Sequence, residues 1–179
     1  MIYLDMDEVI CDLLGKLLNT YNHLYNKNVK IKDIKQWSLE PYIGKEGIEL
    51  FKQPGFFADL DLIGDAASVI EHLRYIGKEI FIITSPVNEY SALDKCLWIK
   101  RYLPFFPVAN LILVGNKGKL LSQIKDGILF DDCPEYLESF GGISVCMDMP
   151  YNKNTKCSHR IVDKDWWEFY RIARYYDNA

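Results

Sequence analysis

Short runs of consecutive apolar residues alternate along the chain with segments in which apolar residues recur at helical spacing. The runs typical of strands buried on both faces of a parallel sheet are 2–4, 80–83, 111–114, 128–130 and 143–146. The amphipathic segments that follow them are 66–76, 89–102, 119–124, 134–139 and 164–176. Residues 151–158 are polar and are predicted to form a loop. This alternation predicts a doubly wound α/β fold around a parallel sheet.

The first two expected strands are separated by more chain than one connection needs. Residues 8–78 lie between Asp7, just after the first strand, and Glu79, just before the second. A single crossover connection needs only about a dozen residues or slightly more. Residues 13–25 have a helical pattern, and the chain after them mixes polar and aromatic positions with Pro and Gly. We therefore predict a core formed by residues 1–12 and 66–179, with residues 13–65 inserted after the first strand as a small helical cap.

Length and charge limit the classes of partner. The chain has 179 residues, is 49% hydrophobic and carries a net charge of −4, so one main domain with a sizeable core is expected. It has no cluster of Lys and Arg, which argues against a long nucleic acid as partner. No run approaches the ~18 apolar residues of a membrane span, so no membrane partner is expected. A small anionic substrate remains compatible, because a metal ion and a few lysines can supply local positive charge.

The cysteines indicate the compartment. They are odd in number and widely spaced and contain no Cys-x-x-Cys pair, so neither a disulfide framework nor a zinc site of the usual spacing is predicted. The chain also begins directly with an apolar strand and shows no signal-peptide pattern. We expect reduced thiols in a cytoplasmic protein, and a homodimer is compatible with the sequence.

Polar side chains that could take part in catalysis or ligand binding lie where the expected strands end. Asp5 follows the first strand, Thr84 follows the second, and Asp131 follows the strand at 128–130. In open α/β sheets, ligands bind in the crevice beyond the carboxyl ends of the strands. We therefore expect these three side chains to converge on one crevice.

Two of the acids suit a covalent route to phosphate transfer. A carboxylate can attack phosphorus and form an aspartyl-phosphate, which divides one difficult step into two. Asp5 is the first acid after its strand and is the predicted nucleophile. Asp7, two residues later, is the predicted acid and base: it can protonate the leaving oxygen and then activate the hydrolytic water.

Attack by one anion on another requires a cation to offset the repulsion. Mg²⁺ takes hard oxygen ligands from one or two carboxylates, a phosphate oxygen and waters. Asp131 and Asp132 are placed to complete such a site with Asp5, and the backbone carbonyl of Asp7 is a further candidate ligand. The sequence therefore predicts a Mg²⁺ site at this edge of the sheet.

The phosphoryl oxygens need donors. Thr84, Ser85 and Lys117 are the candidates, because a hydroxyl or an ammonium can hold oxygens onto which charge spreads. Taken alone, each segment has an ordinary explanation, such as a turn, a helix N-cap or a solvated lysine. Their occurrence at four strand ends in one order favours phosphoryl transfer.

These motifs carry a family resemblance. Asp5-Met6-Asp7-x-Val9, Thr84-Ser85-Pro86, a downstream Lys and Asp131-Asp132 resemble the four motifs of the haloacid dehalogenase superfamily. Residues 54–60, followed by Gly64-Asp65-Ala66, are similar more specifically to the 5'(3')-deoxyribonucleotidases. The resemblance runs from about residue 1 to residue 140. It implies a Rossmann-like core with a small helical cap, Mg²⁺, and dephosphorylation of deoxyribonucleoside monophosphates, often pyrimidine ones.

The chain departs from the family pattern at three points, one of which is that residues 27–52 match the family only weakly beyond Trp37. Glu8 stands where the family more often has Gly, which removes no catalytic group. The spacing from Lys117 to Asp131 is longer than usual in the family, so Lys119 is the alternative to Lys117 as the phosphate lysine.

Aromatic residues of the inserted segment are candidates for contact with the nucleotide. Trp37, Phe56 and Phe57 are expected to stack on the base, an interaction worth about 1–3 kcal/mol, and the alternative is that they form the core of the cap. The predicted function is that of a Mg²⁺-dependent phosphatase for deoxyribonucleoside 5'- or 3'-monophosphates. One alternative is the same chemistry on a sugar phosphate or a modified nucleotide. Another is a non-catalytic binding module of this fold.

Overall fold

A computed structural model describes residues 1–176 and contains one parallel sheet with the strand order β3-β2-β1-β4-β5-β6. The strands are β1 (Ile2–Leu4), β2 (Ile80–Thr84), β3 (Leu111–Leu113), β4 (Ile128–Asp131), β5 (Ile143–Met147) and β6 (His159–Ile161). The helices are α1 (Leu13–Tyr25), α2 (Glu40–Leu50), α3 (Ala66–Tyr75), α4 (Glu89–Tyr102), α5 (Lys117–Leu121), α6 (Pro134–Ser139) and α7 (Trp166–Tyr175), with 3₁₀ turns η1 (Ile31–Asp33) and η2 (Val108–Asn110). The predicted doubly wound α/β fold is confirmed.

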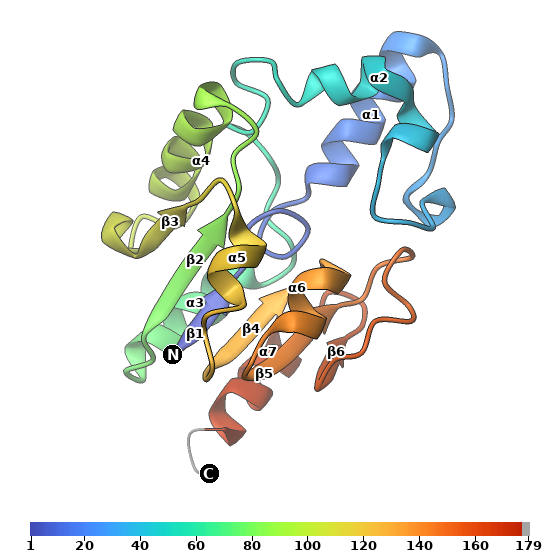
Figure 1. The fold of residues 1–179 in the computed structure, drawn as a ribbon. Coiled ribbons are helices and arrows are strands. Elements are labelled where there is room, and N and C mark those ends of the chain that lie inside the picture. The colour runs from blue at the N-terminus through green and yellow to red at the C-terminus, as the bar shows by residue number, and fades with distance from the viewer. Residues whose placement is uncertain (177–179) are drawn as a thin grey trace.

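Both faces of the sheet are buried under helices, and successive side chains of each strand point to opposite faces. On one face, Leu4 belongs to the same hydrophobic cluster as Trp98 of α4 and Phe169 of α7. On the other face, Tyr3 packs with Leu121 of α5, in a cluster that also includes residues of α6. Figure 1 shows α5 and α6 in front of the sheet, with α3 and α7 behind it. Continuous apolar runs such as Ile2–Leu4 follow directly from this two-sided burial.

The strand order determines where a ligand can bind. Connections run from β1 outward to β2 and β3 on one side, and through β4 to β5 and β6 on the other. The direction of winding therefore reverses between β1 and β4, and a crevice forms outside the carboxyl ends of strands at such a switch point. Asp5 directly follows β1, and Asp131 is the last residue of β4. The topology brings them to this crevice.

The sixth strand was not predicted. Its three residues, His159–Ile161, pair in parallel with β5, opposite Val145, Cys146 and Met147. Two of the three are polar, so no apolar run marks the strand. The Arg160 side chain instead binds the preceding loop through Asp148 and Asn152, each 3.0 Å from its Nη1. An edge strand can form without a continuous apolar run, and here side-chain contacts with the preceding loop hold it in place.

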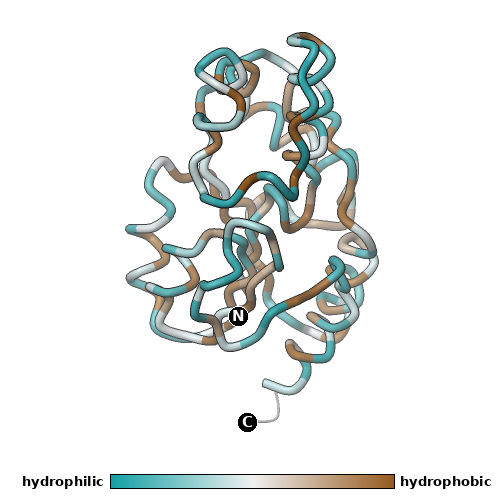
Figure 2. The backbone as a smooth tube through the Cα atoms, turned by 90° about the vertical axis from the view of Figure 1, so that its right-hand side faces the viewer, coloured by the Kyte–Doolittle hydropathy of each residue, from teal (hydrophilic) through white to brown (hydrophobic). Residues whose placement is uncertain are grey.

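The segment between β1 and α3 holds α1, η1 and α2, which lie beyond the carboxyl ends of the strands (Figure 1). Figure 2 shows the same arrangement from the side, as an upper lobe with long hydrophilic stretches above the sheet-containing body. Its buried residues Leu17, Ile34 and Ile43 belong to the same hydrophobic cluster as Leu4. The division into a core (1–12 and 66–179) and a cap (13–65) stays a prediction.

Helix α2 was not predicted, because its glycines and proline interrupt the helical pattern. Pro41 stands in its first turn, and Gly44 has φ 63° and ψ −179° in its middle, so two short helical pieces meet at a kink. Such a broken segment gives no continuous helical periodicity. Among residues 1–176, no helix has both the length and the apolar character needed to cross a membrane.

Candidate functional site

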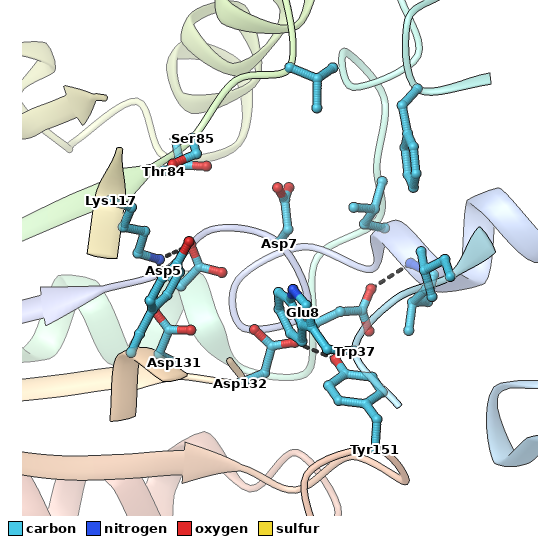
Figure 3. Close-up of a pocket in the computed structure, with 16 residues that line it drawn as sticks. Asp5, Asp7, Glu8, Trp37, Thr84, Ser85, Lys117, Asp131, Asp132 and Tyr151 are labelled. Carbon is cyan, nitrogen blue, oxygen red and sulfur yellow. Dashed lines mark hydrogen bonds and ion pairs between the residues drawn. The ribbon is translucent and has the colours of Figure 1, made fainter. Parts of the chain in front are cut away.

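A cavity of about 310 Å³ opens at the carboxyl ends of β1, β2 and β4. This volume is at the lower end of the range for small-molecule sites, about 300–1,000 Å³. Its polar floor consists of Asp5, Asp7, Glu8, Thr84, Ser85, Lys117, Asp131 and Asp132. Its largely apolar walls consist of Leu13, Leu14, Trp37, Leu39, Phe51, Val87, Tyr136 and Tyr151. Figure 3 shows the labelled residues of the floor converging from separate strand ends.

Lys117 links the two central carboxylates. Its ammonium makes an ion pair with Asp5 and a second one with Asp131, whose Oδ2 lies 2.7 Å from Nζ. All three residues are buried. Burial alone would lower the pKa of Lys117, but the charges of Asp131 and Asp5 outweigh it and raise the pKa above its usual value. The lysine is therefore a permanent cation at the base of the cavity.

The backbone sets this geometry. The N–H of Asp5 donates to the carbonyl of Phe130, so the β1–β4 ladder continues to the point where Asp5 and Asp131 stand side by side. Lys117 is the first residue of α5, and the side chain of Asn116 caps this helix by accepting from the N–H of Lys119 at 2.9 Å. The Lys119 side chain is exposed and does not line the cavity. The structure thus brings Lys117 to the carboxylates and leaves Lys119 outside.

Three carboxylates form a group suited to a cation. Asp5, Asp131 and Asp132 each offer an oxygen, and these oxygens all lie within 4.8 Å of one another. Burial, and then the charges of Asp131 and Asp7, raise the pKa of Asp5 to about 7 despite the neighbouring Lys117. Burial also raises the pKa of Asp132 well above its usual value, and the charge of Asp131 adds to the effect. One lysine does not neutralise this group.

The oxygens are only partly satisfied by protein donors. Oδ1 of Asp131 accepts from the N–H of Cys133 at 2.9 Å, and Oδ2 of Asp132 accepts from the Tyr151 hydroxyl. Oδ1 of Asp132 is buried and has no hydrogen-bond partner among residues 1–176. An excess of buried negative charge with an unpartnered oxygen fits a divalent cation, and an all-oxygen donor set favours a hard one.

Two hydroxyls at the end of β2 belong to the same floor. Thr84 is the last residue of β2, and Ser85 follows it. Their oxygens Oγ1 and Oγ are both buried, and neither has a hydrogen-bond partner within the part of the chain that the structure describes. Buried polar atoms are nearly always paired, so unpaired donors that line a cavity indicate that a ligand supplies the acceptors.

Asp7 has a partner that the sequence did not reveal. Nζ of Lys95 lies 2.7 Å from Oδ1 and 2.6 Å from Oδ2 of Asp7. Asp7 is partly exposed on the cavity floor, whereas the Lys95 side chain is 0% exposed. A signal was present in the sequence: Lys95 shares a face of α4 with the apolar Trp98 and Ile99, three and four residues later. A lysine on the buried face of a helix requires a counter-ion nearby.

The loop before β6 also contributes unexpectedly. The Tyr151 hydroxyl donates to the Asp132 carboxylate, and Nδ2 of Asn152 donates to the Asp132 carbonyl at 2.8 Å. The ring of Trp37 in the upper lobe meets the ring of Tyr151 edge to face, with 5.4 Å between their centroids. The predicted polar loop thus orients Asp132, a candidate metal ligand, and closes one side of the cavity. No local pattern in the sequence indicates these contacts.

The expectation for the aromatic residues is corrected in part. Trp37 lines the cavity and is 50% exposed. Phe56 and Phe57 are only 7% and 2% exposed, and neither lines the cavity. They pack against Phe51, at 6.0 and 6.3 Å between ring centroids, and it is Phe51 that reaches the cavity wall. Aromatic composition could not distinguish the ring that faces the ligand from the rings behind it.

Glu8 occupies a strained position in the loop after β1. Its φ of 59° lies in the left-handed region that glycine tolerates best. The buried side chain offsets this cost by accepting from the N–H of Leu14 at 2.5 Å, at the start of α1. Burial raises the pKa of Glu8 to about 8. The residue therefore connects the loop after β1 to the first helix of the upper lobe.

Comparison with known proteins identifies the family of the chain. The family model for 5' nucleotidase, deoxy (pyrimidine), cytosolic type C protein matches residues 1–175. A 5'(3')-deoxyribonucleotidase of Bacillus subtilis (strain 168) is 32% identical over 175 residues, which cover 94% of each chain.

Solved structures share the fold. A haloacid dehalogenase (HAD) family hydrolase from Deinococcus radiodurans R1, with bound phosphate and sodium, matches with a TM-score of 0.62 at 11% identity, over 91% of this chain and 90% of that one. A haloacid dehalogenase-like hydrolase from Burkholderia xenovorans LB400 matches with a TM-score of 0.58 at 10% identity, over 93% and 97%. Since the family model spans nearly the whole chain and the relative covers it at 32% identity, the chain belongs to the family of cytosolic type C deoxy (pyrimidine) 5' nucleotidases, and it is a phosphoric monoester hydrolase with a haloacid dehalogenase fold.

Proposed function

We propose that the chain hydrolyses deoxyribonucleoside 5'- or 3'-monophosphates through an aspartyl-phosphate intermediate, with Mg²⁺ as its cofactor. The observation that carries this proposal is the floor of the cavity: Asp5 beside Lys117, and the two unpartnered hydroxyls of Thr84 and Ser85. A phosphoryl group placed there would meet a nucleophile, a fixed cation and two donors. The name of the Bacillus subtilis relative supports the substrate class.

In the first half of the reaction, a carboxylate oxygen of Asp5 attacks phosphorus. The bond between phosphorus and the ester oxygen breaks, and Asp7 gives its proton to that oxygen, so that the nucleoside leaves as an alcohol. Lys117, Thr84 and Ser85 hold the other phosphoryl oxygens as negative charge spreads onto them. The phosphoryl group is left on Asp5.

In the second half, Asp7 is a carboxylate and takes a proton from water. The oxygen of this water attacks phosphorus, the bond between phosphorus and Asp5 breaks, and inorganic phosphate leaves. Mg²⁺ held by Asp5, Asp131, Asp132 and the Asp7 carbonyl would supply the positive charge that offsets repulsion between the carboxylate and the phosphate. Tyr151 and Asn152 keep Asp132 oriented for this purpose.

The mouth of the cavity suits the nucleoside. Trp37 and Phe51 present aromatic surface, and Leu39 adds apolar surface beside them. A planar base gains more from such a wall than a sugar with many hydroxyls. The inserted segment 13–65 acts as a cap that excludes water from the reacting groups.

The alternatives have less support. A sugar phosphate or a modified nucleotide would use the same floor, but a sugar would leave the apolar mouth poorly matched. A non-catalytic binding module conflicts with membership in a hydrolase family and with the complete set of reacting groups. A homodimer and a cytoplasmic location stay predictions.

A screen of phosphate release over nucleotides and sugar phosphates tests the substrate class. We expect kcat/KM to be at least about tenfold higher for a deoxyribonucleotide than for its ribo counterpart, because an apolar surface near the 2' carbon would bury a ribose hydroxyl without a partner. Trp37→Ala and Phe51→Ala should each raise KM for nucleotides about tenfold and leave an aryl phosphate almost unaffected. Tyr75→Ala, at a 90% exposed position on α3, is the control. Higher activity on sugar phosphates would favour the alternative substrate class.

The two candidate lysines predict different outcomes. Lys117→Ala should lower kcat/KM about 10²–10³-fold, because it removes a charged donor from the reacting phosphoryl group. It should also lower the melting temperature, since Asp5 and Asp131 then lose their buried counter-ion. Lys119→Ala, at the exposed position two residues later, should change kcat/KM less than about twofold. Normal activity of Lys117→Ala would remove this lysine from the mechanism.

A further inference from the structure

Lys95 is a buried charge in contact with a reacting group, and the mechanism above assigns it no task. Its side chain is 0% exposed, and its Nζ bridges both carboxylate oxygens of Asp7 at 2.7 and 2.6 Å. It does not line the cavity, so it lies behind Asp7 relative to the substrate. Any influence of Lys95 on the reaction therefore passes through Asp7.

Packing alone does not explain a lysine at this position. The same face of α4 carries Trp98 and Ile99, and an apolar side chain of similar length would fill the space without the desolvation cost of a buried ammonium. The ammonium instead lies where it can contact two oxygens at once. A side chain that engages both oxygens restricts rotation of the carboxylate, which a single hydrogen bond does not do.

The neighbours of Lys95 hold the ammonium in turn. Its Nζ lies 4.7 Å from the centroid of the Phe57 ring. Asp94, the preceding residue of α4, accepts from the backbone N–H of Phe57 at 3.3 Å. On the other side, the Cys11 thiol lies 3.7 Å from Oδ1 of Asp7 and 3.3 Å from the carbonyl oxygen of Met6, which is its nearer acceptor. Asp7 is thus held from α4 and, through Phe57, from the segment that leads out of the cap.

We propose that Lys95 is a positioning residue that fixes the carboxylate of Asp7 on the floor of the cavity, ready to exchange a proton with the ester oxygen and then with water. This inference rests on the proposed function, since it requires Asp7 to be the acid and base. It also gives Phe57 a function other than base stacking: its ring is the surface on which the ammonium rests. Figure 3 shows Asp7 projecting from its loop, apart from the group formed by Asp5, Lys117 and Asp131.

A double-mutant cycle tests the inference. Lys95→Met keeps the apolar stem and removes the ammonium, and Lys95→Arg keeps a charged donor. Lys100→Met, at an exposed position on the same helix, is the control. Each change is made in the wild-type chain, Lys95→Met is also made in the Asp7→Asn background, and kcat and KM are measured on one deoxyribonucleotide.

We expect Lys95→Met to lower kcat at least about tenfold, and KM should stay within about threefold of the wild-type value. This loss in kcat is a part of the 10²–10⁴-fold that general acid–base catalysis typically provides. In the Asp7→Asn background, the same change should alter kcat less than about twofold, because its effect passes through Asp7. Lys95→Arg should recover most of the lost rate, and Lys100→Met should behave as wild type. A purely structural lysine would give similar losses in both backgrounds and no rescue.

Stability supplies a second readout. Asp7→Asn should lower the melting temperature, because it leaves the Lys95 ammonium buried beside a neutral group, and adding Lys95→Met should raise it again. If Lys95→Met does not fold, Lys95→Gln takes its place under the same criteria.

The outcomes separate the two claims. Normal kcat in the folded Lys95 variant, together with an inactive Asp7→Asn, overturns the role of Lys95 and leaves the proposed function standing. Full activity of Asp7→Asn overturns both.

Discussion

Asp5→Asn is expected to reduce phosphate release at least about 10⁴-fold, because it removes the proposed nucleophile and leaves only the contribution of binding. The change is nearly isosteric, and the amide oxygen can still accept from Lys117, so the fold should persist. Rapid acid quench of the wild-type enzyme with substrate labelled at phosphorus should recover labelled protein, and the variant should yield none. Asp61→Asn, the same change at an exposed position that does not line the cavity, is the matched control.

The same variant should keep or raise the melting temperature. Burial and the neighbouring Asp131 and Asp7 raise the pKa of Asp5 to about 7, which means that the ionised carboxylate is destabilised where it stands. Its removal relieves repulsion in the folded state, so activity and stability should change in opposite directions. Undiminished turnover by Asp5→Asn, or labelled protein recovered from it, would rule out the covalent route through this residue.

Chelation of divalent metal is expected to abolish activity, and Mg²⁺ should restore it. The reason is the crowding of Asp5, Asp131 and Asp132 around a single lysine, with one oxygen of Asp132 unpartnered. Asp132→Asn should raise the Mg²⁺ concentration needed for half-maximal activity, because it removes a charged ligand. Asp61→Asn should need no more Mg²⁺ than the wild type. Full activity in excess chelator would show that the cluster serves no metal.

The pH dependence of stability gives a readout independent of turnover. Asp5 has a folded-state pKa of about 7, against 3.8 for the free group. Between these values the folded chain holds a proton that the unfolded chain has released, so in the absence of metal the contribution of this group to stability falls as pH rises toward 7. A bound cation stabilises the ionised form. Mg²⁺ should therefore raise the melting temperature more at pH 8 than at pH 5.5, and an equal shift at both pH values would contradict this account.

The sequence by itself determined the sheet and brought most residues of the cavity floor together. Apolar runs such as Ile2–Leu4 indicate, from local composition alone, that a strand is buried on both faces. The carboxyl ends of parallel strands then lie at the same edge of the sheet. The positions of Asp5, Thr84 and Asp131 in one crevice therefore required no knowledge of side-chain packing. Lys117 reaches the same crevice for a related reason: it begins the helix that follows β3.

The tertiary structure decided the contacts that support this floor. Lys95 and Asp7 are 88 residues apart, and Tyr151 and Asp132 are 19 apart, so neither pair leaves a periodic signal in the chain. Which of the neighbouring rings Phe51, Phe56 and Phe57 would face the cavity depended likewise on how the upper lobe packs. Hydrophobic periodicity predicts whether a side chain is buried, because the backbone repeat of a helix or strand determines which residues share a face. The identity of its partner depends on how distant segments pack together, and only the folded chain determines that.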